Sequence, residues 1–132
     1  MRNLLSLFLL VIFSGCVIKN ESESQTQATV LENPFIHTAY FWLNQDVTED
    51  QKAAFITDCE KLAEIETVRA FYSGSPANTD RDVIENTYDY AVVFHFKDLE
   101  DQEYYQQHPL HLKMIEMHQE KWEKVMVTDI EH

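Results

Sequence analysis

The chain has 132 residues, which fits one domain with or without a tail, and its 10 Lys and Arg against 23 Asp and Glu give a formal net charge of −13. This acidity argues against a nucleic-acid partner, because phosphate binding needs a clustered positive patch. The 45% hydrophobic content excludes a disordered acidic tail, and two glycines cannot build a glycine-rich phosphate loop.

Residues 1–15 predict a bacterial lipoprotein signal peptide. Arg2 precedes an apolar run, residues 4–13, that is shorter than the about 20 residues needed to span a bilayer. The sequence Phe13-Ser14-Gly15-Cys16 resembles a lipobox, although Phe13 stands where Leu is usual. The resemblance implies cleavage before Cys16 and a lipid on that residue; the alternative is an ordinary signal peptide that happens to hold a cysteine. A lipid-anchored protein of the cell envelope, on the periplasmic or surface side, is therefore expected.

The polar segment that follows predicts a flexible tether. Residues 16–34 carry Lys, Glu, Ser and Gln without hydrophobic periodicity. Such a tether would hold a globular domain, residues 35–131, away from a membrane. If Cys16 carries lipid, Cys59 is left without a partner, and its place on the apolar side of a predicted helix indicates a small core residue.

The domain opens with a predicted strand and helix. Residues 35–43 are rich in aromatic side chains and follow Asn33-Pro34, which indicates a strand. Both faces of this strand are largely apolar, so both should be covered. A helix is expected from Thr48 to about Glu64, because Thr48-Glu49-Asp50-Gln51 forms a capping box and three apolar residues follow at helical spacing, Phe55, Cys59 and Leu62.

The rest of the domain predicts two more strands, two helices and a closing strand. The expected strands cover residues 67–73, 88–96 and 125–130, and the expected helices cover residues 99–106 and 109–124. Alternate residues of the third strand share an apolar face: Tyr88, Tyr90, Val92, Phe94 and Phe96. Pro109 suits a first helical position, where its missing N–H has no cost.

This order predicts an α+β protein, a ferredoxin-like βαββαβ sandwich. The helices of such a sandwich cover one face of the sheet only. Tyr40 and Trp42 on the other face then need a second cover, and a second copy of the same sheet would supply it as a homodimer, a dimeric α+β barrel. The alternative is a monomer with exposed aromatic residues.

Candidate functional groups gather between Tyr105 and His111. With Pro109 as the first helical residue, His108 lies at the cap and His111 in the first turn, where the positive end of the helix favours neutral imidazole. Neutral imidazole can serve as a general base or a metal ligand, and the Tyr105 hydroxyl can orient an oxyanion. His37 could point into the same space from the first strand.

Several motifs in order resemble the stress-responsive A/B-barrel (Dabb) domain family. They are His37, Thr79-Asp80-Arg81-Asp82-Val83-Ile84 leading into Tyr88-Asp89-Tyr90-Ala91, Tyr105-x-x-His108-Pro109-x-His111, and Trp122-Glu123-Lys124-Val125 with Asp129. The resemblance covers residues 36–130 and implies a ferredoxin-like homodimer. Most members have no assigned reaction. In a plant branch, the olivetolic acid cyclase type, the Tyr and second His of the motif act on a polyketide, which implies such roles for Tyr105 and His111 with support from His37.

Three functions from different classes are expected. The leading one is binding of a small, largely apolar molecule between sheet and helices, with five ligand-binding residues: His37, Phe41, His108, Ile115 and Trp122. The second is a cofactor-free cyclase, lyase or isomerase with His111 as general base and Tyr105 as orienter. The third is a structural or stress-protective dimer without a ligand. No cofactor and no metal is predicted.

Each histidine also has a structural interpretation. His108 could cap its helix, His111 could pack under the sheet, and His37 could bond to backbone. His118 is expected to pack beside Trp122. Zinc held by the three candidate histidines is not favoured, because His-x-x-His alone is not diagnostic and no Cys or acid cluster joins it.

Overall fold

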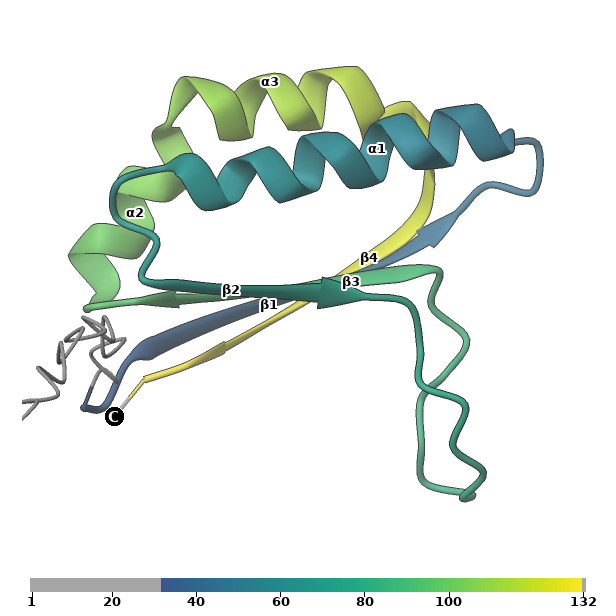
Figure 1. Ribbon diagram of the computed structural model, residues 1–132, viewed down its shortest axis with the longest axis horizontal. Coiled ribbons are helices and arrows are strands. Elements are labelled where there is room, and N and C mark those ends of the chain that lie inside the picture. Colours follow the sequence, from purple (N-terminus) through teal and green to yellow (C-terminus); the bar gives the residue numbers. More distant parts are fainter. Residues whose placement is uncertain (1–31, 132) are drawn as a thin grey trace, which may run out of the picture.

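The computed structural model describes residues 32–131, which form a two-layer α+β sandwich (Figure 1). The sheet is antiparallel with strand order β2-β3-β1-β4. Its strands are β1 (Phe35–Leu43), β2 (Ala70–Gly74), β3 (Tyr90–Phe96) and β4 (Trp122–Ile130). The helices on one face are α1 (Glu49–Lys61), α2 (Leu99–Gln107) and α3 (Pro109–His118), with short 3₁₀ turns η1 (Leu62–Glu64) and η2 (Gln119–Lys121). The ferredoxin-like fold class is confirmed.

Side chains cap all three helices. The Thr48 hydroxyl accepts a hydrogen bond from the Gln51 amide at 3.3 Å, while the Gln51 side chain accepts from the Thr48 amide at 2.9 Å, so the predicted capping box is present. Asp98 accepts from the Asp101 amide at 3.0 Å to begin α2. His108 accepts from a backbone amide to begin α3. Each helix therefore begins where a side chain replaces a missing carbonyl partner.

The helix-facing side of the sheet and the inner side of α1 form the core. Phe55 and Cys59 of α1 are fully buried, and Leu62 follows them in η1. The Phe55 ring meets the Phe41 ring edge-on, with 5.0 Å between the centroids. The predicted apolar stripe of this helix is confirmed, and the Cys59 thiol is free and buried as a core residue.

Within residues 32–131, no helix lies over the opposite side of the sheet (Figure 1). We call it the open face; it includes Ile36, Tyr40, Trp42, Tyr72, Val93, Met126 and Ile130. Tyr72 is 61% exposed and Ile130 51% exposed. Tyr88, just before β3, adds its ring here, 5.2 Å from the ring of Tyr40. The prediction that both faces of β1 carry apolar side chains is therefore confirmed.

Two strands begin later than expected. The second strand starts at Ala70 and not at residue 67, because the Val68 amide donates to the Ile65 carbonyl at 2.9 Å and closes a turn. The third starts at Tyr90 and not at residue 88. The Asp89 amide still donates to the Phe41 carbonyl at 2.8 Å, but the Leu43 amide is bonded to the Asp89 carboxylate, also at 2.8 Å, so a side chain takes the place of the next backbone partner.

The last helix is shorter than expected, and the last strand is longer. Helix α3 ends at His118 and not near Lys124, and β4 starts at Trp122 and not at Val125. Trp122 pairs with the end of β1, and the Asn44 amide donates to the Lys121 carbonyl at 2.9 Å. The prediction that the helix extends through Trp122 was wrong, because strand pairing fixes the position of this residue.

The predictions for residues 1–31, including the signal peptide, Cys16 and most of the tether, lie outside the described residues. Within residues 32–131, no helix combines the length and apolar character needed to cross a membrane.

Candidate functional site

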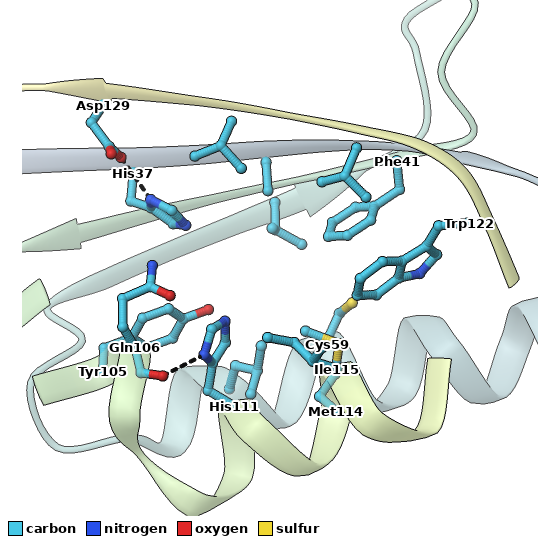
Figure 2. A pocket seen from close by; sticks show the side chains of 15 residues that line it. His37, Phe41, Cys59, Tyr105, Gln106, His111, Met114, Ile115, Trp122 and Asp129 are labelled. Carbon is cyan, nitrogen blue, oxygen red and sulfur yellow. Dashed lines mark hydrogen bonds and ion pairs between the residues drawn. The ribbon is translucent and has the colours of Figure 1, made fainter. Parts of the chain in front are cut away.

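A cavity of about 230 Å³ lies between the sheet and the helix layer. It reaches solvent along the edge strand β4, where the lining residues Val125 and Val127 are 39% and 49% exposed. One end of the cavity is polar and the other is apolar (Figure 2). The polar end is built from His37, Tyr105, Gln106, His111 and Asp129.

His37 enters the polar end from β1, and Asp129 of β4 fixes its ring. The two residues face each other in the register of β1 and β4. The Nδ1–H of His37 donates to a carboxylate oxygen of Asp129, 2.6 Å away. The His37 side chain is buried, while that of Asp129 is 46% exposed at the rim. This pairing sets the tautomer and ring orientation of His37 and leaves Nε2 for the cavity.

His111 enters from the first turn of α3, and the backbone orients it. Its Nδ1–H donates to the Gln106 carbonyl at 3.0 Å, near the end of α2. Burial lowers the pKa of His111, and the carbonyl opposes this effect. The ring is therefore held neutral, with Nε2 as an unprotonated acceptor.

Tyr105 lies between these two imidazoles. Its ring centroid is 6.0 Å from that of His37 and 4.6 Å from that of His111. Burial raises the pKa of Tyr105, so the phenol stays protonated and can donate a hydrogen bond. A protonated phenol between two imidazoles can donate a hydrogen bond to a ligand oxygen while a neutral imidazole removes a proton from the same ligand.

The apolar end is walled by side chains from both layers. It is lined by Phe41 of β1, Met114 and Ile115 of α3, and Trp122 of β4, together with Cys59 and Leu62. The Phe41 and Trp122 rings are 5.1 Å apart at their centroids. Burial raises the pKa of the Cys59 thiol, so Cys59 contributes a small apolar surface and not a nucleophilic thiolate.

Six of the seven candidate residues line this one cavity: His37, Phe41, Tyr105, His111, Ile115 and Trp122. His108 does not. Its Nδ1 accepts from the Leu110 amide at 3.2 Å, and its Nε2 lies 3.8 Å from a carboxylate oxygen of Glu66, outside the cavity. The structure therefore places His108 in the capping position that was its structural alternative.

His118 lies where α3 meets α1. It is 2% exposed, and its Nε2 is 2.9 Å from a carboxylate oxygen of Asp58. Its ring packs against Phe55 at a centroid distance of 5.4 Å, and the Trp122 ring packs on the same Phe55 at 6.1 Å. His118 thus joins α3 to α1 and takes no part in the cavity.

Sequence reasoning missed two members of the polar end. Asp129 had been noted only as fitting the family pattern, because nothing local shows that it pairs with a residue of the first strand. Gln106 lies within the segment singled out, but its backbone carbonyl, and not a chemical motif, orients His111. Only the strand register and the break between α2 and α3 bring these groups into place.

Metal binding has no assembled ligand set in the part of the chain that the structure describes. Within residues 32–131, no three His, Cys, Asp or Glu side chains come together in a way that could hold a metal ion. Both Nδ1 atoms of the cavity histidines are already hydrogen-bonded, and His108 faces elsewhere.

Solved structures share this fold. A dimeric ferredoxin-like protein of unknown function from Thermobifida fusca is 25% identical, with a TM-score of 0.64 over 79% of this chain and 96% of that one. A dimeric protein of unknown function from Bacteroides fragilis is 22% identical, with a TM-score of 0.61 over 78% and 100% of the two chains. A hydroxynitrile lyase from Passiflora edulis is 18% identical, with a TM-score of 0.64 over 76% and 94%. The match takes up 94–100% of each of these three chains, so the fold forms in them without a further domain.

Among curated proteins, none is detectably similar to this chain. The family model described as the stress responsive A/B barrel domain matches residues 35–132, which takes in the whole sheet and helix layer. The order of elements and the histidine-tyrosine segment agree with that match. The chain therefore belongs to the stress-responsive A/B barrel (Dabb) domain family.

Proposed function

We propose that the domain binds a small, largely apolar molecule in the cavity between sheet and helices. One observation carries this proposal: the cavity is open along β4 and yet ends in a buried group of hydrogen-bonding side chains. Apolar walls around a few convergent polar groups are characteristic of small-molecule sites. Phe41, Ile115 and Trp122 line the space without filling it, which argues against the structural dimer without a ligand.

Native mass spectrometry of residues 32–132, produced in a bacterial host, tests this proposal. We expect a bound small molecule on the unmodified domain. Val127→Trp is the matched control, because Val127 lies at the exposed mouth and a large ring there would obstruct the cavity. The same adduct at the same occupancy on both proteins would place the molecule elsewhere and contradict the proposal.

A homodimer is the proposed assembly. The relatives from Thermobifida fusca and Bacteroides fragilis are described as dimeric. The open face of this chain supports the same arrangement, because it leaves aromatic and aliphatic side chains uncovered. Sedimentation equilibrium at micromolar concentration should give twice the mass of the chain, and a monomer would contradict the proposal.

A cofactor-free enzyme is the second candidate, and the tautomer of His111 favours it. The free Nε2 could remove a proton from a carbon next to a carbonyl, leaving the bonding electrons in an enolate whose oxygen accepts from the Tyr105 hydroxyl. Returning a proton to that carbon completes an isomerisation or exchange without an oxidant or reductant. The geometry supplies both groups at the polar end.

Hydrogen–deuterium exchange of a simple aryl ketone, phenylacetone, measures this activity without a known substrate. We expect the domain to accelerate exchange at the carbon next to the carbonyl, and His111→Asn to abolish the acceleration while keeping ketone binding. Asn keeps an N–H for the Gln106 carbonyl but has no basic nitrogen. If the ketone binds clearly but its exchange is not accelerated, the enzyme proposal is contradicted and only the binding proposal stands.

We also propose that the chain is a lipoprotein anchored through Cys16 in the cell envelope. Labelled palmitate should enter the full chain when it is made in bacteria. Cys16→Ser should abolish labelling, whereas Cys59→Ala should not, because Cys59 is buried in the fold. Equal labelling of the Cys16→Ser chain would overturn this proposal.

A further inference from the structure

The polar end of the cavity offers acceptors on two sides. The carbonyl of Gln106 can only accept, so the Nδ1 of His111 carries the hydrogen between them and Nε2 has the lone pair. The carboxylate of Asp129 imposes the same tautomer on neutral His37. Figure 2 shows the second nitrogen of each ring turned toward the cavity, His37 from the sheet and His111 from the helix layer.

Tyr105 adds a donor between these acceptors. Since burial raises the pKa of its phenol, the O–H is retained at ordinary pH. A ligand that satisfies both kinds of group must donate to an imidazole and accept from the phenol. A hydroxyl does both; an ammonium only donates, and a carboxylate only accepts.

The charges that line the cavity further restrict the class of ligand. Among the described residues that line the cavity there is no Lys or Arg, and Asp129 is the one acidic side chain. His111 is held neutral by burial, and a protonated His37 would be matched by Asp129, 2.6 Å away. The C-terminal end of α2 and the N-terminal end of α3 meet at this point, so their opposite dipole ends offset one another. A carboxylate would therefore lose its water without gaining a counter-charge.

Volume limits the rest of the ligand. The cavity holds about 230 Å³. This exceeds the about 150 Å³ that suffices for benzene and is smaller than the about 300–1,000 Å³ of drug-sized sites. One ring or a short branched chain fits against Phe41 and Trp122 at the apolar end.

We infer that the cavity selects neutral, hydroxyl-bearing apolar molecules of about one ring in size and rejects carboxylates of the same frame. The inference rests on the proposed binding function and adds the chemical class of the ligand. Tyr105 and His111 would share the ligand hydroxyl, while Asp129 would repel anions from the mouth.

Four probes that share a phenyl ring with one attached carbon test the inference: toluene, benzyl alcohol, benzoate and benzylammonium. Each is titrated into residues 32–132 while the amide signals of cavity residues are followed by NMR. Benzyl alcohol should bind at least about tenfold more tightly than benzoate, because an unpaired charge in an apolar site is costly. Benzylammonium should also bind more weakly than benzyl alcohol.

Two conservative variants separate the hydrogen bonds from the charge. Tyr105→Phe keeps the ring and removes the donor, so it should weaken benzyl alcohol about fivefold to tenfold and leave toluene within about twofold. Asp129→Asn keeps an oxygen for the Nδ1–H of His37 and removes the charge. It should therefore reduce the difference in affinity between benzyl alcohol and benzoate.

Failure of the hydroxyl inference and failure of the proposed binding function give different outcomes. If none of the four probes moves cavity signals up to its solubility, the proposed binding function fails. If toluene and benzyl alcohol bind but respond alike to Tyr105→Phe, the cavity is a binding site and the hydroxyl inference is overturned. Tightest binding by benzoate or benzylammonium would also overturn it. Circular dichroism of both variants checks that they remain folded.

Discussion

His108 and His111 are three residues apart and have different surroundings. The His108 ring turns back to the amide of Leu110 and lies near Glu66 on the surface. The His111 ring turns inward, where the Gln106 carbonyl fixes its tautomer. The difference follows from helix geometry, because the cap residue lies outside the first turn and the third helical residue lies within it.

Loss of the His108 cap should destabilise the domain without affecting the cavity. His108→Ala leaves the Leu110 amide without its side-chain acceptor, at a cost of about 1 kcal/mol in the free energy of unfolding. His108→Asn supplies a new acceptor and should recover most of that loss. Urea denaturation of both variants measures this, and an unchanged His108→Ala midpoint would contradict the capping role.

The lowered pKa of His111 should appear in the pH dependence of stability. The unfolded chain takes up a proton on this ring near pH 6.5, whereas the folded chain does so only at lower pH. The unfolded state therefore gains protons first, and the contribution of His111 lowers the free energy of unfolding as pH falls below about 6.5.

The test compares urea midpoints at about pH 7.5 and about pH 5.5. The unmodified domain should lose more stability over this interval than His111→Asn, which has no group that titrates there. Equal losses would mean that the ring is protonated as readily in the folded chain as in the unfolded one.

At the scale of elements, α1 and α3 are joined by a buried polar contact as well as by packing. Asp58 of α1 accepts from His118 at the end of α3, 2.9 Å away, and from Lys61 at 2.8 Å. The hydrogen bond from Lys61 and then that from His118 lower the pKa of Asp58. The His118 contact crosses between helices, while the Lys61 contact stays within one turn of α1.

These two contacts should differ in their effect on stability. Asp58→Ala leaves the buried His118 nitrogen without its acceptor and should cost about 1–3 kcal/mol in the free energy of unfolding. Lys61→Ala removes only an exposed partner and should cost much less. Thermal and urea unfolding of both variants measure the difference; equal losses would show that the contact between helices adds nothing.

The sequence predicted elements better than it predicted their ends. The Thr48 capping box and the Pro109 start are local signals, and the structure confirms both helix starts. The end of α3 was wrong because apolar residues at helical spacing continue past His118. Strand pairing with β1, a contact made far along the chain, turns Trp122 into the first residue of β4.

The same difference between local and distant contacts determines which residues of the site could be predicted from the sequence. Tyr105 and His111 could be found because one short segment holds both. Asp129 could not, because it is 92 residues from His37 and only the register of β1 with β4 joins them. The space itself could not be predicted either, since it depends on how far the helix layer extends over β4.

At the scale of the whole molecule, the open face of the sheet has no cover from residues 32–131. The helices protect one side of the sheet, and the open face carries large apolar side chains with Trp42 at its edge. The Lys124 ammonium lies 4.0 Å from the centre of the Trp42 ring, so part of this ring is screened by a neighbour. The central part of the open face, around Val93, is where a second sheet would make most contact.

A charge in the middle of the open face should therefore separate a dimer. Val93→Asp would place a carboxylate between two apolar sheets and should shift the domain to monomer at micromolar concentration. Leu112→Asp is the matched control, because Leu112 is 53% exposed on α3, away from the open face. Sedimentation velocity gives the mass, circular dichroism checks the fold, and dissociation of both variants alike would contradict this use of the open face.

The pairing of β1 with β4 also sets an order in time. A ribosome makes His37 early and Asp129 late, so the two meet only after nearly all of the domain has been synthesised. Until then β1 has no paired strand on that side, and its aromatic residues lack their contacts with β4. A chain interrupted before β4 could form both helices of the polar end and would still lack one cavity wall and the partner of His37. The cavity and its polar end are therefore complete only once β4 has been synthesised.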